Sequence, residues 1–253
     1  MKGQRELIEI IKEVAKGKYS NDIMELTKPG YPDPIREIAE AVGMMMVKIE
    51  AREFWLDELN KQLKENIIKS VSSIADALGA RDEYTEGHGL RVALYAERLA
   101  RRLGLPENEI GHIKTAGILH DIGKIGFSDR VFSDEDTTPV EELLLEIRQH
   151  PVQGYEILRN LDFLGPVLEY VLCHHERLDG KGYPGGKTSD EIPIGAKILS
   201  VADCFDAMTT DRPYKKGKAL KEAFVSLQEM GGCGLDPDIV AVFLDEIREG
   251  GME

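Results

Sequence analysis

The sequence has little of what marks secreted and membrane proteins. Only three of its 253 residues are cysteines, Cys173, Cys204 and Cys233, and they lie far apart. An odd and scattered set argues against a disulfide framework and for a reducing compartment. No stretch approaches the ~18 to 20 apolar residues of a membrane span, and the N-terminus lacks the apolar region of a signal peptide. We therefore expect a cytoplasmic protein without a membrane span.

Basic residues are outnumbered by acidic ones. The chain has 32 Lys and Arg residues against 46 Asp and Glu residues, a formal net charge of −14. Binding of a nucleic-acid polymer needs clustered positive charge, so we do not expect such a partner. An anionic substrate would have to be held locally, by metal ions and a few cations. Hydrophobic residues make up 42% of the chain, which is enough for a core, and the length allows one large domain or two smaller ones.

Apolar periodicity predicts helices along nearly the whole chain, and therefore an all-α fold. A first helix over 5–15 is followed by a short extended apolar piece, Ile23–Leu26. A long helix should begin near Pro34, which fits a first turn, with Asp33 as its cap. Further helices are expected over 88–103, 108–119, 139–149, 154–160, 164–174, 195–208, 220–230 and 237–248. Residues 176–194 form the long irregular stretch of this half, and a loop of that length is usually functional.

The long helix carries a narrow apolar stripe typical of a coiled coil. Its members follow steps of three and four residues, at Ile35, Ile38, Val42, Met45 and Ile49, and again at Leu56, Leu59 and Leu63. Two successive steps of four, at Ile67 and Val71, then form a stutter. We interpret residues 1–63 as a dimerisation segment that gives a parallel homodimer, and residues 64–253 as the catalytic domain. The alternative is an amphipathic helix that packs on its own domain.

Histidine and aspartate residues are placed as a metal site would need them. Asp121 directly follows His120, and His174 is adjacent to His175. Asp203 ends the apolar run 198–202, where a buried carboxylate costs several kcal/mol unless it is paired. Imidazole nitrogen and carboxylate oxygen suit Fe, Mn, Zn and related metals. The alternative is a set of separate histidines, each satisfied by a local hydrogen bond.

Several motifs follow one another in a characteristic order: His120-Asp121-Ile-Gly-Lys124, His150-Pro151, His174-His175-Glu176-Arg177, Gly182-Tyr183-Pro184 and Val201-Ala202-Asp203. In this order, from about Ile67 to Leu244, the chain resembles the HD-GYP family of HD-domain metal phosphohydrolases. The resemblance implies an HD-domain helical bundle that hydrolyses cyclic di-GMP to pGpG through a hydroxide held between two metal ions, and whether cleavage continues to GMP stays open. A 3′,3′-cGAMP phosphodiesterase and a non-catalytic cyclic-dinucleotide sensor stay open as alternatives.

The resemblance also implies the ligand set. The first metal would be held by His88, His120, Asp121 and Asp203. The second would be held by His150, His174 and His175, with Asp121 as the bridge. We expect two divalent ions, Fe or Mn. Some family members use a glutamate for a third metal, and Tyr84 stands at that position here.

Substrate contacts follow from the same resemblance. Lys124 would contact the scissile phosphate, Arg212 and Lys215 would hold the second phosphate and the guanine, and Asp206 would support the site. Three acidic residues at 134–136 replace a basic turn, and they would weaken substrate binding if that loop lies over the site. The N-terminal residues 4–53 resemble a HAMP module, a parallel four-helix coiled coil made by two chains.

Overall fold

The computed structural model describes residues 3–79, 87–132, 139–211 and 216–250, with their side chains except those of 75–79 and 132. Within these ranges the regular elements are ten α-helices and five 3-10 helices, with isolated bridges and no strand. The all-α fold predicted from the sequence is confirmed. In the same ranges no helix is long and apolar enough to cross a membrane. The chain divides into two compact units, residues 1–66 and 67–253.

The first unit contains α1 (Gln4–Val14), η1 (Asn21–Thr27) and the beginning of α2 (Asp33–Gly79). The prediction of an extended piece at Ile23–Leu26 is wrong, because these residues belong to the 3-10 helix η1. Residues three apart lie on the same side of a 3-10 helix. Ile23 and Leu26 can therefore both enter the core, where each is 2% exposed, whereas a strand would turn them to opposite faces.

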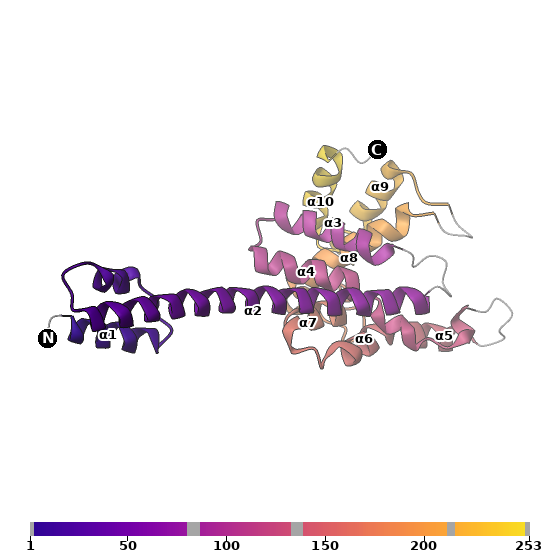
Figure 1. Cartoon of the computed structure of the whole chain (residues 1–253). Helices are drawn as coiled ribbons and strands as arrows, with labels where there is room; N and C mark the ends of the chain where they lie inside the picture. Colours follow the sequence, from indigo (N-terminus) through magenta and orange to yellow (C-terminus); the bar gives the residue numbers. More distant parts are fainter. Residues whose placement is uncertain (1–2, 80–86, 133–138, 212–215, 251–253) are drawn as a thin grey trace. The chain divides into compact units, whose positions relative to one another are not determined.

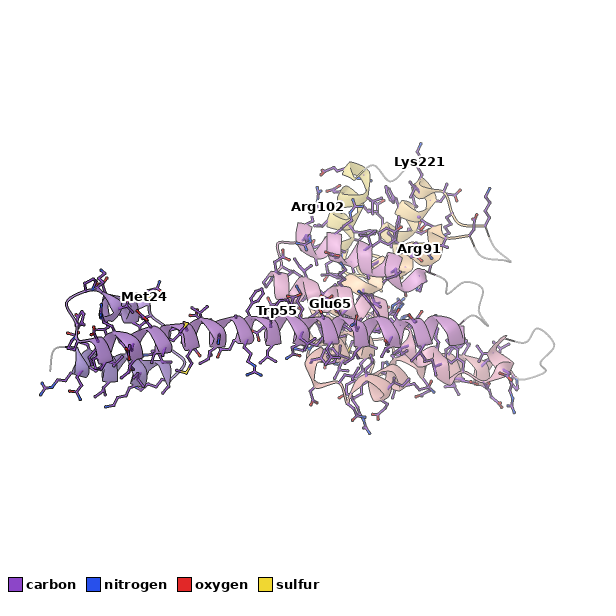
Figure 2. All side chains as sticks on the ribbon, in the orientation of Figure 1. Met24, Trp55, Glu65, Arg91, Arg102 and Lys221 are labelled. Carbon is purple, nitrogen blue, oxygen red and sulfur yellow. The ribbon has the colours of Figure 1, made fainter. Side chains whose placement is uncertain are left out.

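The apolar stripe of α2 is divided between two environments. Ile35 and Val42 are buried against Leu7 of α1 and the two core residues of η1. Other members are exposed in the single chain, with exposed fractions of 46 to 61%: Ile38, Met45, Leu56, Leu59 and Leu63. Trp55, labelled in Figure 2, is also exposed. Within the first unit, one edge of the stripe is therefore covered and much of the rest is exposed.

The second unit is a bundle of helices around α8 (Ile194–Thr209), which is buried along most of its length. The helices that pack on α8 are α3 (His88–Arg102), α4 (Glu107–Leu119), α7 (Val167–Cys173), α9 (Leu220–Met230) and α10 (Pro237–Glu249). The shorter elements are η2 (Ile122–Gly126), η3 (Asp129–Phe132), α5 (Val140–Ile147), α6 (His150–Leu158), η4 (Asp162–Leu164) and η5 (Ser189–Glu191). Figure 1 shows α3 and α4 running side by side. Phe205 and Phe243, fully buried, contact each other in the core.

Most predicted helix boundaries lie within three residues of the observed ones. The prediction of a helix beginning at 154 is wrong, because α6 begins at His150. Pro151 occupies the first turn of this helix, where its missing N–H costs nothing. The early start matters because it places a histidine at the beginning of a helix.

The contact between α3 and α4 depends on a glycine. A Cβ at Gly117 would lie 2.6 Å from Cα of Ala93, so the two helices approach each other too closely for any side chain there. Because α3 begins with His88 and α4 is followed by His120, this contact brings the two histidines together. On the outer side, Arg102 of α3 (Figure 2) pairs with Glu246 and Glu249 of α10 at 3.1 and 2.6 Å.

We expect Gly117→Ala to lower the free energy of unfolding by about 1 to 3 kcal/mol, the range for overpacking a close contact. Gly111→Ala is the matched control, because it lies in the same helix and nothing is within 4 Å of its Cβ position. That variant should gain up to about 1 kcal/mol from helix propensity. Urea unfolding followed by circular dichroism measures both, and equal effects would contradict the close approach.

Candidate metal centre

The structure brings all seven ligand residues predicted from the sequence into one region of the second unit. Six of them lie at the ends of helices: His88 and His150 begin α3 and α6, His120 and Asp121 follow α4, and His174 and His175 follow α7. Asp203 comes from the interior of α8. Three overlapping groups have all their ligand atoms within 4.8 Å of one another: His88, His120 and Asp203; His150, His174 and His175; and His120, Asp121 and His174.

Asp121 lies between the first two groups. Its Oδ2 is 3.3 Å from Nε2 of His120 and 3.6 Å from Nε2 of His88. Its Oδ1 is 3.5 Å from Nε2 of His150, which belongs to the other group. One carboxylate therefore presents one oxygen to each group, as a bridging ligand would.

Three of the histidines are oriented by the last turn of a helix. The carbonyl oxygens there have no intrahelical partner. Nδ1 of His120 donates to the carbonyl of Gly117 at 2.9 Å. The same bond, from Nδ1 to the carbonyl three residues earlier, occurs at His150 with 2.8 Å and at His174 with 2.6 Å. A carbonyl can only accept, so each Nδ1 carries the proton and each Nε2 of a neutral ring keeps its lone pair.

His88 is oriented by Asp206, which is 118 residues away in the chain. Its Nδ1 lies 2.7 Å from Oδ2 of Asp206. The guanidinium of Arg91 donates to both carboxylate oxygens of Asp206, at 2.7 and 3.0 Å. The Asp206 side chain is only 1% exposed. Histidines that bind metals commonly donate their other nitrogen to a carboxylate in this way.

The protonation states also suit metal binding. Burial is the main cause that lowers the pKa of three rings: His150 to about 4, His174 well below its usual range, and His175. Metal ligands must offer neutral imidazole and ionised carboxylate. Burial raises the pKa of Asp121, but Lys124 and His120 outweigh it and hold that pKa well below its usual range. Burial likewise raises the pKa of Asp203, and His88 outweighs it and lowers the pKa.

His88 differs from the other rings because carboxylates surround it. Burial lowers its pKa, yet Asp203 and Asp206 outweigh burial and raise the pKa to about 9. Its Nε2 lies 3.3 Å from Oδ1 of Asp203. The same negative surroundings that favour a proton on this ring favour a cation beside it.

These residues fit a metal ion. Nε2 of His120 is buried and has no hydrogen-bond partner. Nε2 of His150 and Nε2 of His174 face each other at 3.2 Å. Because both Nδ1 atoms already carry the proton, neither of the facing nitrogens can donate to the other. A cation shared between them would satisfy both lone pairs, and nitrogen and oxygen donors suit Fe, Mn or Zn.

Of the predicted substrate contacts, Lys124 lies in the candidate metal centre, beside Asp121. Its Nζ is 2.6 Å from Oδ2 of Asp121. It belongs to η2, which packs on α6 so closely that Gly123 has no room for a Cβ against the carbonyl of His150. Arg212 and Lys215 lie outside the described residues, as do Tyr84 and the acidic residues 134–136.

The sequence interpretation missed two supporting residues. Ser200, one turn before Asp203, donates its hydroxyl to the carbonyl of His174. Glu176 is 3% exposed and accepts backbone N–H bonds from Gly185 and Lys187 at 2.6 and 2.9 Å. The one sequence signal for either residue was the position of Glu176, directly after the pair His174-His175.

Comparison with known proteins gives a family match and several relatives. The description of the HD domain matches residues 62–239. A cyclic di-GMP phosphodiesterase of Thermotoga maritima is 40% identical over 190 residues, which cover 73% of this chain and 51% of that protein. The 3′3′-cGAMP-specific phosphodiesterase 2 of Vibrio cholerae is 35% identical over 189 residues, which cover 74% of this chain and 36% of that protein. The chain thus spans about half or less of the length of these relatives.

Among solved structures, the HD domain of the L. monocytogenes phosphodiesterase PgpH in complex with cyclic-di-AMP aligns with a TM-score of 0.53. The alignment covers 70% of this chain and 94% of that domain, at 17% sequence identity. At that identity the likeness concerns the fold.

Proposed function

The chain belongs to the HD-domain family, as its motifs predicted, and we propose that it is a metal-dependent phosphodiesterase that hydrolyses cyclic di-GMP to pGpG, with further cleavage to GMP left open. HD-domain phosphohydrolases depend on metals. The observation that carries the proposal is the position of Asp121, with one carboxylate oxygen towards each histidine group. A single-ion site would have no need for this arrangement.

We assign two divalent ions, Fe or Mn, to the two groups. The first would be held by His88, His120, Asp121 and Asp203, and the second by His150, His174, His175 and Asp121. Bound there, a metal pair supplies an activated water and neutralises charge on the phosphoryl group. No residue of the chain has to form a covalent bond to phosphorus.

The protein side chains orient the reaction. Lys124 lies beside Asp121 and can donate to a non-bridging phosphate oxygen as a point charge. Asp206 was predicted as a substrate contact, but both of its oxygens already accept bonds from His88 and Arg91. We therefore assign Asp206 to the orientation of His88. Arg212 and Lys215 stay our prediction for the second phosphate and the guanine.

A second substrate, 3′,3′-cGAMP, stays open because relatives named for it match nearly as well as those named for cyclic di-GMP. The metal ligands would be the same, and only contacts to the second base would differ. A non-catalytic sensor is less well supported, since all seven ligand positions are filled. Turnover of both dinucleotides by anaerobically purified protein, with metal analysis of the same sample, tests these functions together. Absence of turnover with full metal content would favour the sensor.

Asp121→Ala should lose at least one metal ion per chain and nearly all turnover, because Asp121 is assigned to both ions. Elemental analysis and single-turnover assays measure the two effects. Asp162→Ala is the matched control, an exposed aspartate in η4, and should leave both unchanged. An Asp121→Ala protein with two ions and a normal rate would rule out the dinuclear assignment.

Lys124→Ala should keep both ions and lose rate by roughly 10²- to 10³-fold, the usual effect of removing one well-placed donor to the transition state. Lys221→Ala, an exposed lysine of α9 labelled in Figure 2, is the control and should be neutral. Metal content and kcat separate the possibilities. Loss of metal would assign Lys124 to support of the ligands, and an unchanged rate would remove it from the site.

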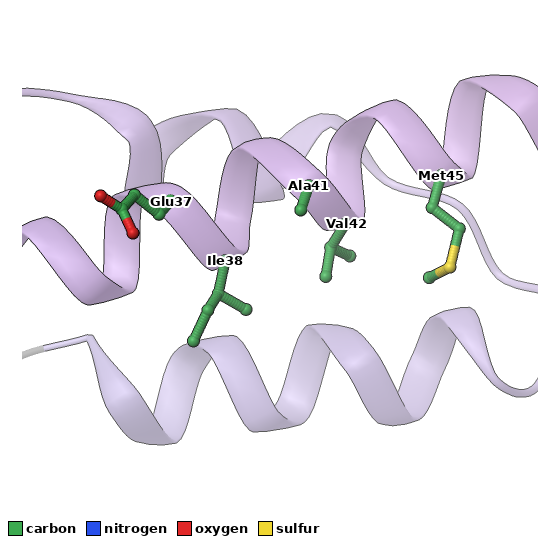
Figure 3. Close-up of a pocket in the computed structure, with 5 residues that line it drawn as sticks. All are labelled: Glu37, Ile38, Ala41, Val42 and Met45. Atoms are coloured by element: carbon green, nitrogen blue, oxygen red, sulfur yellow. The ribbon is translucent and has the colours of Figure 1, made fainter.

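We further infer that residues 1–63 form a dimerisation segment and residues 64–253 the catalytic domain. The exposed part of the α2 stripe supports a second copy as the partner. A groove of about 300 Å³ is lined by Glu37, Ile38, Ala41, Val42 and Met45. Figure 3 shows Ile38, Val42 and Met45 leaving α2 on the same side, on successive turns. An apolar stripe that repeats at heptad steps along one helix matches the same stripe of a parallel copy.

Ile38→Asp combined with Met45→Asp should therefore give monomers that still bind metal. Each new charge would meet its own copy across the dimer axis without a partner. Met44→Asp combined with Val47→Asp is the matched control, since both residues are exposed on other faces of α2. Sedimentation velocity at micromolar concentration decides the question. A wild type that is already monomeric, or a double variant that stays dimeric, would contradict the dimer.

A further inference from the structure

One of the five histidines in the candidate metal centre lacks the support that the other four have. Nδ1 of His88 is fixed by a carboxylate, and Nδ1 of His120, His150 and His174 by a backbone carbonyl. The side chain of His175 makes no hydrogen bond with any residue that the structure describes. Ligand rings that are not held in place bind metal more weakly, so something else must orient this one.

The ring of Tyr183 lies against the ring of His175. Its centroid lies 4.8 Å from the centroid of His175, with an angle of 31° between the ring planes. The two rings are tilted against each other, as are those of His174 and His175 at 4.1 Å and 43°, whereas His150 meets His175 edge-on at 84°. The backbone N–H of Tyr183 also donates to the carbonyl of His175 at 3.2 Å. Main chain and side chain of the tyrosine thus both hold the same histidine.

The loop that carries Tyr183 is itself fastened to the residue after His175. The buried carboxylate of Glu176 accepts the N–H groups of Gly185 and Lys187. On the other side of Tyr183, a Cβ at Gly182 would lie 2.5 Å from Cα of Glu176. The loop backbone therefore packs directly on the Glu176 backbone, with no space for a side chain between them. This fixes where the tyrosine ring can lie.

We propose that Tyr183 is a positioning residue for His175, and that its ring fixes the imidazole plane by stacking, where the other four histidines use a hydrogen bond. The proposal rests on the proposed function, because it takes His150, His174 and His175 to hold a metal ion. It gives the Gly-Tyr-Pro segment a role in metal binding that needs the aromatic ring and not the hydroxyl.

Mn²⁺ titration followed by electron paramagnetic resonance tests this without any activity measurement. Tyr183→Leu should lower the affinity for one of the two ions by roughly 10- to 100-fold, the usual effect of losing the support of a ligand. The affinity for the other ion should stay unchanged. Tyr183→Phe keeps the ring and should bind both ions like the wild type. Tyr155→Leu, a half-buried tyrosine of α6, is the control and should also bind both normally.

Three results would overturn the proposal: wild-type affinities in Tyr183→Leu, equal weakening of both ions, or a Tyr183→Phe protein as weak as Tyr183→Leu. Glu176→Gln gives a second route if Tyr183→Leu does not fold, because it loosens the loop while keeping the tyrosine. Glu176→Gln should lower the affinity for the same ion whose affinity is lowered by His175→Ala. An unchanged affinity would count against the proposal. A wild type that binds fewer than two ions would instead contradict the dinuclear site itself.

Discussion

Two ring nitrogens that cannot donate face each other across 3.2 Å, Nε2 of His150 and Nε2 of His174. Lone pairs in such proximity are unfavourable on two rings that are each only 1% exposed. The fold holds them there because each ring is committed through Nδ1 to a backbone carbonyl. A shared cation would relieve this arrangement. Much of the second unit holds these two nitrogens in place. It also holds the carboxylate of Asp121 between the two histidine groups.

The fold achieves this by using the ends of helices. A helix that ends near the centre leaves carbonyl oxygens without partners, and a histidine just beyond it can use one of them. The same geometry therefore satisfies the helix end and selects the tautomer of the ligand. Close contacts between backbones bring these ends together, at Gly117 against Ala93 and at Gly123 against His150. Small residues in the second unit thus determine the distances in the metal centre.

In the proposed function, metal binding and substrate choice are carried by different parts of the chain. The assigned ligands lie on helix ends and on α8, where four of the histidines are at most 2% exposed and Asp121 and Asp203 are 14 and 17% exposed. The predicted contacts to the second half of the substrate, Arg212 and Lys215, follow α8 in the sequence. On this assignment, one ligand set serves either dinucleotide. This separation explains why the ligand motifs support the reaction class more firmly than the substrate.

The sequence by itself determined the helical fold and identified the seven residues that the structure brings together as candidate metal ligands. Helices could be predicted because burial of one face imposes a period of 3.6 residues. The candidate ligands could be predicted because the order of local motifs such as His120-Asp121 and His174-His175 resembles a known family. The error at Ile23–Leu26 has the same basis, since a four-residue segment with three apolar residues is too short to distinguish a strand from a 3-10 turn. The apolar stripe of α2 was visible in the sequence. The sequence did not indicate that Ile35 and Val42 would be covered by residues of their own chain.

Only the tertiary structure decided how the ligands are oriented. The bond between His88 and Asp206 joins residues 118 positions apart, and nothing in the sequence near either residue specifies the other. The stack of Tyr183 on His175 depends on a loop that Glu176 fastens from inside. Periodicity reports which side of an element is buried. It does not report what the buried side meets, because that depends on how elements distant in the sequence pack together.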